Sequence, residues 1–274
     1  MAKTKLMSKF RTTEISNPEF ESNNLRFITV KTANLKGRGD ICVFVPTGKN
    51  LTDLPIVTLL HGVYGSAWIW AQKTGIHLKM KTWIENGEIE PMIIAMPSDG
   101  LWGDGSGYLP HKNVDFEKWI VEDVQNAVKE LIPEASQKSK LCIAGLSMGG
   151  FGALRLGIKN FNKFSGVSGL SSITILEEMK LFVEEDLSEY NQNEKENESV
   201  YATILKHQHQ KLPPFRFDCG KDDELIEGNR KLHQQLKDLK IEHIYKENQG
   251  KHEWMYWETH INETLLFFDA ILTK

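Results

Sequence analysis

The chain has 274 residues, 40% of them hydrophobic, and a formal net charge of −4 at pH 7. These values predict a single globular catalytic domain over residues 1–274, because a chain of this length has room for one large core and shows no repeated set of motifs. The net charge is small and the Lys and Arg residues are scattered, so we expect no nucleic-acid partner.

The N-terminal segment carries charge but no apolar core of signal-peptide length, and no later segment could span a bilayer. Cys42, Cys142 and Cys219 all fall in strand-like segments, where a free cysteine behaves as a small buried hydrophobe. An odd cysteine count favours a reducing compartment. We therefore expect a cytoplasmic protein with no membrane partner, unless a leader precedes this sequence.

Regular elements follow one another along most of the chain. Segments 25–32 and 39–45 predict two strands that start the sheet in antiparallel fashion. Continuous apolar runs of the kind buried in a parallel sheet predict the next strands, at 55–60 and 92–96. Helical periodicity then covers 116–132 and ends at a proline. The later elements are expected at 140–144 (strand), 151–158 (helix), 214–220 (strand), 241–245 (strand) and from 253 onward (helix).

The alternation of strands and helices breaks between residues 171 and 213. This stretch is polar, acidic and prone to helix formation, so we predict a helical insertion ahead of the strand at 214–220. Folds of this type carry a cap over the active site at this position. A solvated surface excursion without substrate contact is the equal alternative.

The most informative motif runs from Gly145 to Gly149 and has Ser147 at its centre. A buried strand precedes it and a helix follows, which is the context of a nucleophile elbow. The sharp turn holds the serine Oγ clear of its own backbone, where a histidine can remove its proton. We predict that Ser147 is a nucleophile in an α/β-hydrolase fold, with a mostly parallel central sheet and helices on both faces.

An enzyme of this type also needs two backbone N–H donors for the oxyanion. One comes from the residue after the nucleophile, and the other from the loop after the strand that ends at His61-Gly62. Met148 and Val63 are therefore the expected donors. We expect His61 to pack at the strand end and to steady this loop through hydrogen bonds.

The catalytic acid should follow Ser147 in the chain and precede the histidine. Asp223 is the preferred candidate, because it lies in the loop that leaves the strand at 214–220 and starts the next helix. Asp222 would serve if the loop turned one residue earlier. Asp218 is a weaker rival, because it still belongs to the strand.

His252 is the predicted base among the nine histidines of the chain. It lies in a loop after the last predicted strand, at the carboxyl end, where the catalytic side chains of open α/β sheets gather. His207, His209, His233 and His260 all fall in helical stretches. The chain order is then Ser147, Asp223, His252, as this class of enzyme requires.

Aromatic and acidic side chains in the same loops suggest contacts with a sugar ring, because aromatic faces pack on C–H groups and carboxylates accept hydroxyl hydrogens. Asp99 and Asp104 are too few to predict a calcium site, and no His or Cys spacing suggests zinc. We expect no metal and no cofactor. The predicted substrate-binding residues are Trp68, Trp102, Asp104, Tyr108 and Trp254.

Four separated blocks together resemble the putative esterase family: His61-Gly62 with Trp68 downstream, the elbow, 219–223 and 250–254. The resemblance runs from about residue 40 to the C-terminus. That family contains esterase D (S-formylglutathione hydrolase), tributyrin esterases, feruloyl and acetyl esterases acting on plant polysaccharides, and mycolyltransferases. By motif it implies the same nucleophile, acid and base.

The chain departs from esterase D on both sides of the elbow serine. Esterase D proteins usually have a histidine before the serine and another after the paired glycines, whereas this chain has Leu146 and Phe151. The pattern is closer to that of tributyrin and feruloyl esterases. We therefore expect a serine carboxylic ester hydrolase that acts on a small-molecule ester with a short acyl group or an acylated carbohydrate.

Two other functions stay as alternatives: an S-formylglutathione hydrolase-like thioesterase, and a non-catalytic hydrolase-fold protein used for binding. Retention of all three triad residues argues against the second. Acyl transfer to an acceptor other than water stays open, and so does a homo-oligomeric state.

Overall fold

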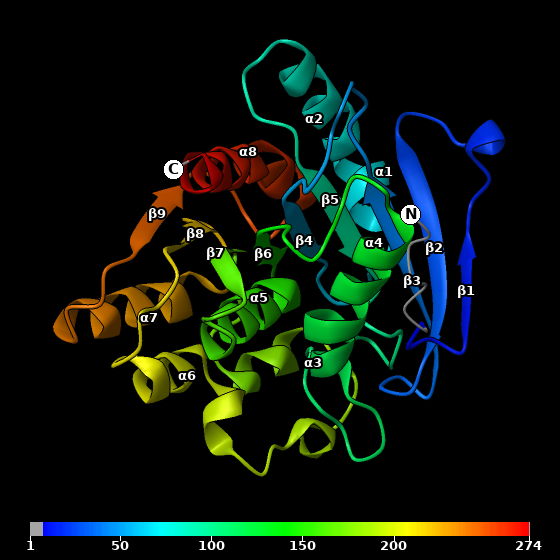
Figure 1. Ribbon diagram of the computed structural model, residues 1–274. Coiled ribbons are helices and arrows are strands. Elements are labelled where there is room, and N and C mark those ends of the chain that lie inside the picture. The colour runs from blue at the N-terminus through cyan, green and yellow to red at the C-terminus, as the bar shows by residue number, and fades with distance from the viewer. Residues whose placement is uncertain (1–7, 274) are drawn as a thin grey trace.

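The computed structural model describes residues 8–273 and contains a nine-stranded sheet flanked by helices on both faces (Figure 1). The strand order is β1-β2-β3-β5-β4-β6-β7-β8-β9. Strands β1 to β3 pair antiparallel, β3 pairs antiparallel with β5, and all pairs from β5 to β9 are parallel. The strands are β1 (Thr12–Ile15), β2 (Leu25–Thr32), β3 (Gly37–Phe44), β4 (Ile56–Leu60), β5 (Ile93–Pro97), β6 (Leu141–Leu146), β7 (Phe164–Leu170), β8 (Phe215–Gly220) and β9 (Ile244–Asn248).

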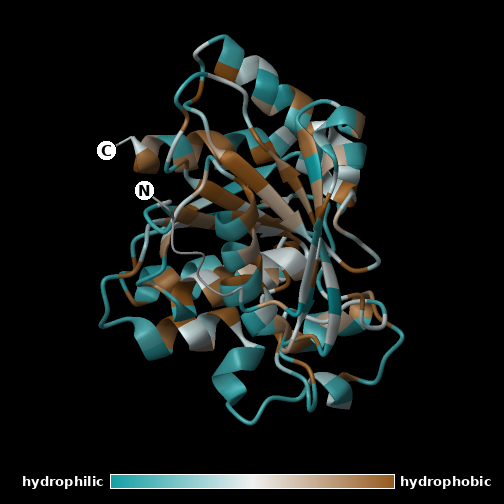
Figure 2. Cartoon of the chain, turned by 45° about the vertical axis from the view of Figure 1, so that its right-hand side comes forward, coloured by the Kyte–Doolittle hydropathy of each residue, from teal (hydrophilic) through white to brown (hydrophobic). Residues whose placement is uncertain are grey.

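This arrangement confirms the predicted α/β-hydrolase fold, including the antiparallel start of the sheet. Two strands, β1 and β7, were not predicted from the sequence. The last strand, β9, begins at Ile244, three residues later than predicted. Hydrophobic residues gather on the central strands of the sheet (Figure 2).

Two hydrophobic clusters form the core, one on each face of the sheet. On one face, α4, α5, α6 and α7 supply the cluster, while α1, α2 and α8 supply the other. The predicted helix at 116–132 is α3 and α4 joined by a π-helical stretch, Trp119–Val124. The helices are α1 (Ile69–Thr74), α2 (Ile76–Glu85), α3 (Phe116–Lys118), α4 (Gln125–Leu131), α5 (Met148–Lys159), α6 (Val200–His207), α7 (Ile226–Asp238) and α8 (Trp254–Leu272).

The segment between β7 and β8 contains less α-helix than its composition suggested. It forms three short 3-10 helices, Leu176–Leu181, Leu187–Tyr190 and Lys195–Glu198, before α6. Local side-chain hydrogen bonds favour short turns here, as at Asp186, whose carboxylate accepts the N–H of Ser188 at 2.8 Å. Within residues 8–273, no helix has both the length and the apolar character needed to cross a membrane.

Candidate active site

Ser147 occupies a sharp corner between β6 and α5, with φ 54° and ψ −120°. Two glycines allow this corner to form. A Cβ at Gly145 would lie 2.2 Å from the carbonyl oxygen of Gly149, and a Cβ at Gly149 would lie 2.4 Å from that of Leu60. The sequence therefore lets α5 approach β4 and β6 closely, and a positive φ at a serine is strain of the kind stored at functional sites.

The structure brings Ser147, His252 and Asp223 together into one chain of hydrogen bonds. His252 Nε2 lies 2.9 Å from Ser147 Oγ, and His252 Nδ1 lies 3.0 Å and 3.1 Å from the two carboxylate oxygens of Asp223. With Nδ1–H donating to the carboxylate, Nε2 is free to accept the serine proton. This geometry can activate a serine hydroxyl for attack on a carbonyl carbon.

Asp223 is 3% exposed, and its carboxylate also accepts the N–H of Leu225 at 2.8 Å. Burial acts to raise its pKa, but the hydrogen bond and charge of His252, with the Leu225 N–H, outweigh that effect and lower the pKa from its ordinary value. The acid therefore stays ionised in the pH range where a histidine acts as a base, and it can stabilise the imidazolium.

Asp222 and Asp218, the two alternative candidates for the catalytic acid, lie in surroundings that differ from those of Asp223. The Asp222 side chain is exposed, and its backbone N–H donates to the carbonyl of Gly250 at 3.1 Å. Asp218 is fully buried in β8, where it pairs with Arg216 at 2.9 Å and accepts the hydroxyl proton of Tyr256 at 2.8 Å. Neither carboxylate is hydrogen-bonded to His252 among the described residues.

Tyr256 connects this buried pair to the histidine loop. Its ring packs on Gly250, where a Cβ would come within 2.8 Å of the ring. Gly250 has φ +134°, a backbone conformation that favours glycine. The loop that presents His252 is therefore held by close packing on the first turns of α8.

The expected oxyanion donors, Val63 and Met148, flank Ser147 from the β4 loop and from the start of α5. Within residues 8–273, neither backbone N–H donates to another protein atom. His61 is buried, as expected, and steadies this loop: its Nδ1–H donates to the Gly62 carbonyl at 2.6 Å and its Nε2 accepts the N–H of Asp99 at 3.0 Å.

A cavity of about 260 Å³ opens beside Ser147 and His252. Its wall is mainly apolar, and four side chains that were not singled out from the sequence belong to it: Tyr64, Ile69, Phe182 and Trp257. Phe182 stacks on the His252 imidazole with 4.8 Å between ring centroids, and Trp257 meets the same imidazole edge to face at 5.0 Å. Phe182 comes from the insertion between β7 and β8, and no local motif in its own segment marks it.

Of the five residues predicted to bind substrate, Trp254 alone lies in the wall of this cavity. Trp68 is 49% exposed at the start of α1, next to the cavity residue Ile69. Trp102 packs instead edge to face on Tyr190 and His111, at 5.3 Å and 4.4 Å.

Tyr108 and Asp104 depart most clearly from the prediction that they bind substrate. Tyr108 is completely buried, and its hydroxyl donates to the carbonyl of His61 at 3.0 Å, so its side chain supports the loop and cannot touch a substrate. The carboxylate of Asp104 accepts the backbone N–H of Glu184 at 2.8 Å. The loop does follow a strand end, as predicted, but its own packing uses these side chains.

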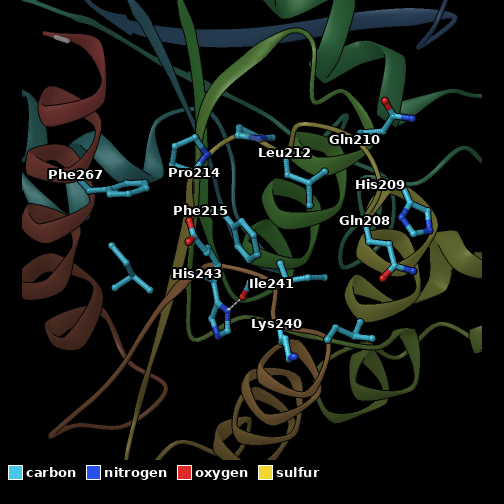
Figure 3. A pocket seen from close by; sticks show the side chains of 14 residues that line it. Gln208, His209, Gln210, Leu212, Pro214, Phe215, Lys240, Ile241, His243 and Phe267 are labelled. Carbon is cyan, nitrogen blue, oxygen red and sulfur yellow. Dashed lines mark hydrogen bonds between the residues drawn. The ribbon is translucent and has the colours of Figure 1, made fainter.

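A second, larger depression of about 660 Å³ lies at the amino ends of β8 and β9, whereas Ser147 lies at the carboxyl ends of the strands (Figure 3). Phe215, Phe267 and Ile241 contribute apolar surface, and His243 and Lys240 contribute polar groups. His243 Nδ1 lies 2.7 Å from the Ile241 carbonyl oxygen. None of the proposed catalytic side chains lines this depression.

Metal removal gives a first prediction. Asp223, Glu224 and His252 have possible ligand atoms within 4.8 Å of one another, but the ligand atoms of Asp223 and His252 already bond to each other. We therefore expect dialysis against EDTA to leave the rate of p-nitrophenyl acetate hydrolysis unchanged. A loss of activity that divalent ions restore would contradict this prediction.

Comparisons with known proteins show which family the chain is similar to. The family model described as "Putative esterase" matches residues 32–268. An acetyl esterase of Caldicellulosiruptor saccharolyticus is 27% identical over 227 residues, which cover 76% of this chain and 81% of the relative.

Solved structures give the same picture for the fold. A ferulic acid esterase has a TM-score of 0.76 at 21% identity and covers 96% of this chain and 99% of its own. An S-formylglutathione hydrolase from Agrobacterium tumefaciens has a TM-score of 0.76 at 16% identity, with 97% of this chain and 100% of its own covered. At these identities the likeness shows a shared fold.

Proposed function

Because the chain belongs to the "Putative esterase" family and is a carboxylic ester hydrolase, we propose that it acts through an acyl-enzyme on Ser147. His252 is the proposed base and Asp223 the acid that orients it. The observation that carries the proposal is the continuous hydrogen-bonded chain from Ser147 Oγ through His252 to the Asp223 carboxylate. A non-catalytic binding protein would have no use for this arrangement.

In the first half-reaction, Ser147 Oγ attacks the ester carbonyl carbon while His252 Nε2 takes the hydroxyl proton. The negative charge that develops on the carbonyl oxygen is stabilised by the N–H groups of Val63 and Met148. The bond to the alcohol oxygen then breaks, and His252 returns the proton to the leaving alcohol. Water, activated by His252, attacks the acyl-enzyme and releases the acid and free Ser147.

We propose short acyl groups as substrates, because the cavity beside Ser147 is small. Its volume of about 260 Å³ is below the range of roughly 300–1,000 Å³ typical of pockets for drug-sized ligands. The apolar side chains of Ile69, Leu146 and Trp254 suit a short alkyl group. A long acyl chain would need a continuous apolar channel.

A series of p-nitrophenyl esters tests this substrate class. We expect kcat/KM for acetate and butyrate to exceed that for octanoate by about tenfold or more, since an excluded chain loses its binding energy and its correct position. A clear preference for octanoate would contradict the short-acyl proposal while leaving the nucleophile assignment standing.

We propose that the alcohol part of the ester is a carbohydrate, so that the substrate is an acylated carbohydrate. Trp68 and Tyr64 are exposed beside the cavity, and aromatic faces of this kind pack on sugar rings. The acetyl esterase relative supports an acetyl ester. An S-formylglutathione hydrolase-like thioesterase is the second candidate, so acetylated xylo-oligosaccharides and S-formylglutathione belong in the same assay series.

A further inference from the structure

Asp104 and the segment Phe182–Glu185, here called the strap, hold each other through a reciprocal pair of hydrogen bonds. The N–H of Glu184 donates to Asp104 Oδ2 at 2.8 Å, and the N–H of Asp104 donates to Glu185 Oε1 at 2.9 Å. Bonds between a carboxylate and a backbone N–H are among the stronger ones in proteins. The strap belongs to the insertion between β7 and β8, about 80 residues away in the chain.

The same residue also holds the loop that carries the proposed oxyanion donor. The carbonyl of Asp104 accepts the N–H of Tyr64 at 2.8 Å, and Tyr64 directly follows Val63. The Tyr64 hydroxyl donates to the carbonyl of Phe182, which returns the connection to the strap. Tyr64 has φ +60°, a conformation that a tyrosine rarely adopts unless its surroundings hold it there.

These contacts form a closed network on one side of the active site. At one point of this network, the strap residue Phe182 stacks on the His252 imidazole and forms part of the cavity wall. At another, Val63 faces Gly105, where a Cβ would come within 3.3 Å of the valine side chain. Asp104 contacts both the strap and the oxyanion loop, and Tyr64 joins the same two segments directly.

We propose that Asp104 is a positioning residue that fastens the strap over His252 and thereby sets both the size of the acyl cavity and the place of the imidazole. This proposal rests on the proposed function, because it assigns Asp104 a part in selecting the acyl group. It also gives the insertion between β7 and β8 the role of a cap. The carboxylate makes no ion pair within residues 8–273, so its described partner is the strap itself.

The test compares Asp104→Ala with two other variants. Asp104→Asn keeps an oxygen that can accept the Glu184 N–H. Asp186→Ala is the matched control, because it removes a carboxylate that accepts a backbone N–H at the same 2.8 Å, but within the insertion alone. We expect Asp104→Ala to lower the acetate-to-octanoate ratio of kcat/KM about tenfold, the effect of losing one charged hydrogen bond.

The two comparison variants should keep the ratio close to that of the wild type. In Asp104→Ala, kcat for the acetate ester should fall as well, since His252 loses its stacked ring. An Asp104→Ala variant with the wild-type ratio and kcat overturns the proposal. So does an equal change in Asp186→Ala. If Asp104→Ala does not fold, Phe182→Ala replaces it, with the same fall in the ratio expected and an unchanged ratio contradicting the proposal.

Hydrogen exchange separates this proposal from the proposed function. Peptides that cover residues 179–185 should exchange about tenfold faster in Asp104→Ala than in the wild type or in Asp186→Ala, because the strap opens more often. Unchanged exchange overturns the proposal. If the wild-type protein hydrolyses none of the esters, the proposed function fails, and the exchange rates still decide whether Asp104 fastens the strap.

Discussion

Replacement of Ser147 by alanine is expected to lower kcat for p-nitrophenyl acetate by about four to six orders of magnitude. The variant lacks the oxygen that attacks the carbonyl carbon, so the oxyanion donors and the binding contacts are all that remain. The fold should persist, because Ser147 Oγ bonds to His252 alone among the described side chains and alanine leaves the corner unchanged. Circular dichroism and thermal melting check the fold, and initial rates check the activity.

Ser66→Ala serves as the matched control for this loss. Ser66 lies in the loop after β4, and its hydroxyl makes no hydrogen bond with other residues of the described range. We expect its activity to stay within about twofold of the wild type, because the substitution removes a hydroxyl that has no described hydrogen-bond partner. Near-wild-type turnover in well-purified Ser147→Ala would contradict the assigned nucleophile.

The second large effect is expected at Asp223. Asp223→Asn should lower kcat by about three to four orders of magnitude with little change in KM, because an amide cannot hold the required imidazole tautomer or stabilise the imidazolium. Asp222→Asn should stay near the wild type, since its exposed carboxylate makes no hydrogen bond among the described residues and its backbone N–H is unchanged by the substitution. Equal effects of the two substitutions, or a larger one at Asp222, would place the catalytic acid one residue earlier.

The proposed nucleophile and its partners could be read from the sequence because their signals are local. Gly145 and Gly149 mark a corner that only small residues can make, and the structure shows the backbone atoms that exclude larger ones. Asp223 and His252 each follow a strand, and the carboxyl ends of parallel strands meet at one edge of the sheet. The structure places all three side chains in hydrogen-bonding contact, and their catalytic roles stay a prediction.

The substrate residues were harder to predict because their partners are distant in the chain. Tyr108 and Asp104 lie in a loop of the expected kind, but the first is buried under His61 and the second bonds to the strap. A loop that supports the site therefore shows the same pattern of aromatic and acidic residues as a loop that binds substrate, and this pattern does not distinguish the two. Phe182 carried no signal, since nothing in its own segment indicates that it meets His252.

Strand β7 was missed for a similar reason. Its sequence, Phe164–Leu170, contains two glycines and two serines, which single-residue propensities assign to turns. The structure explains the small residues, because α5 and α8 pack closely against this strand: a Cβ at Gly166 would lie 3.0 Å from the Phe268 ring, and one at Gly169 would lie 3.0 Å from Leu154. Close packing by helices on both faces cannot be inferred from the strand alone.

The most direct test of the central claim is to find where a fluorophosphonate adds to the wild-type protein. Intact-mass and peptide mass spectrometry should show a single adduct, on Ser147, formed in step with the loss of esterase activity, because His252 activates that hydroxyl alone. The Ser147→Ala variant should show no adduct. An adduct at another residue, or full inhibition with Ser147 unmodified, would contradict the assignment of Ser147 as the nucleophile.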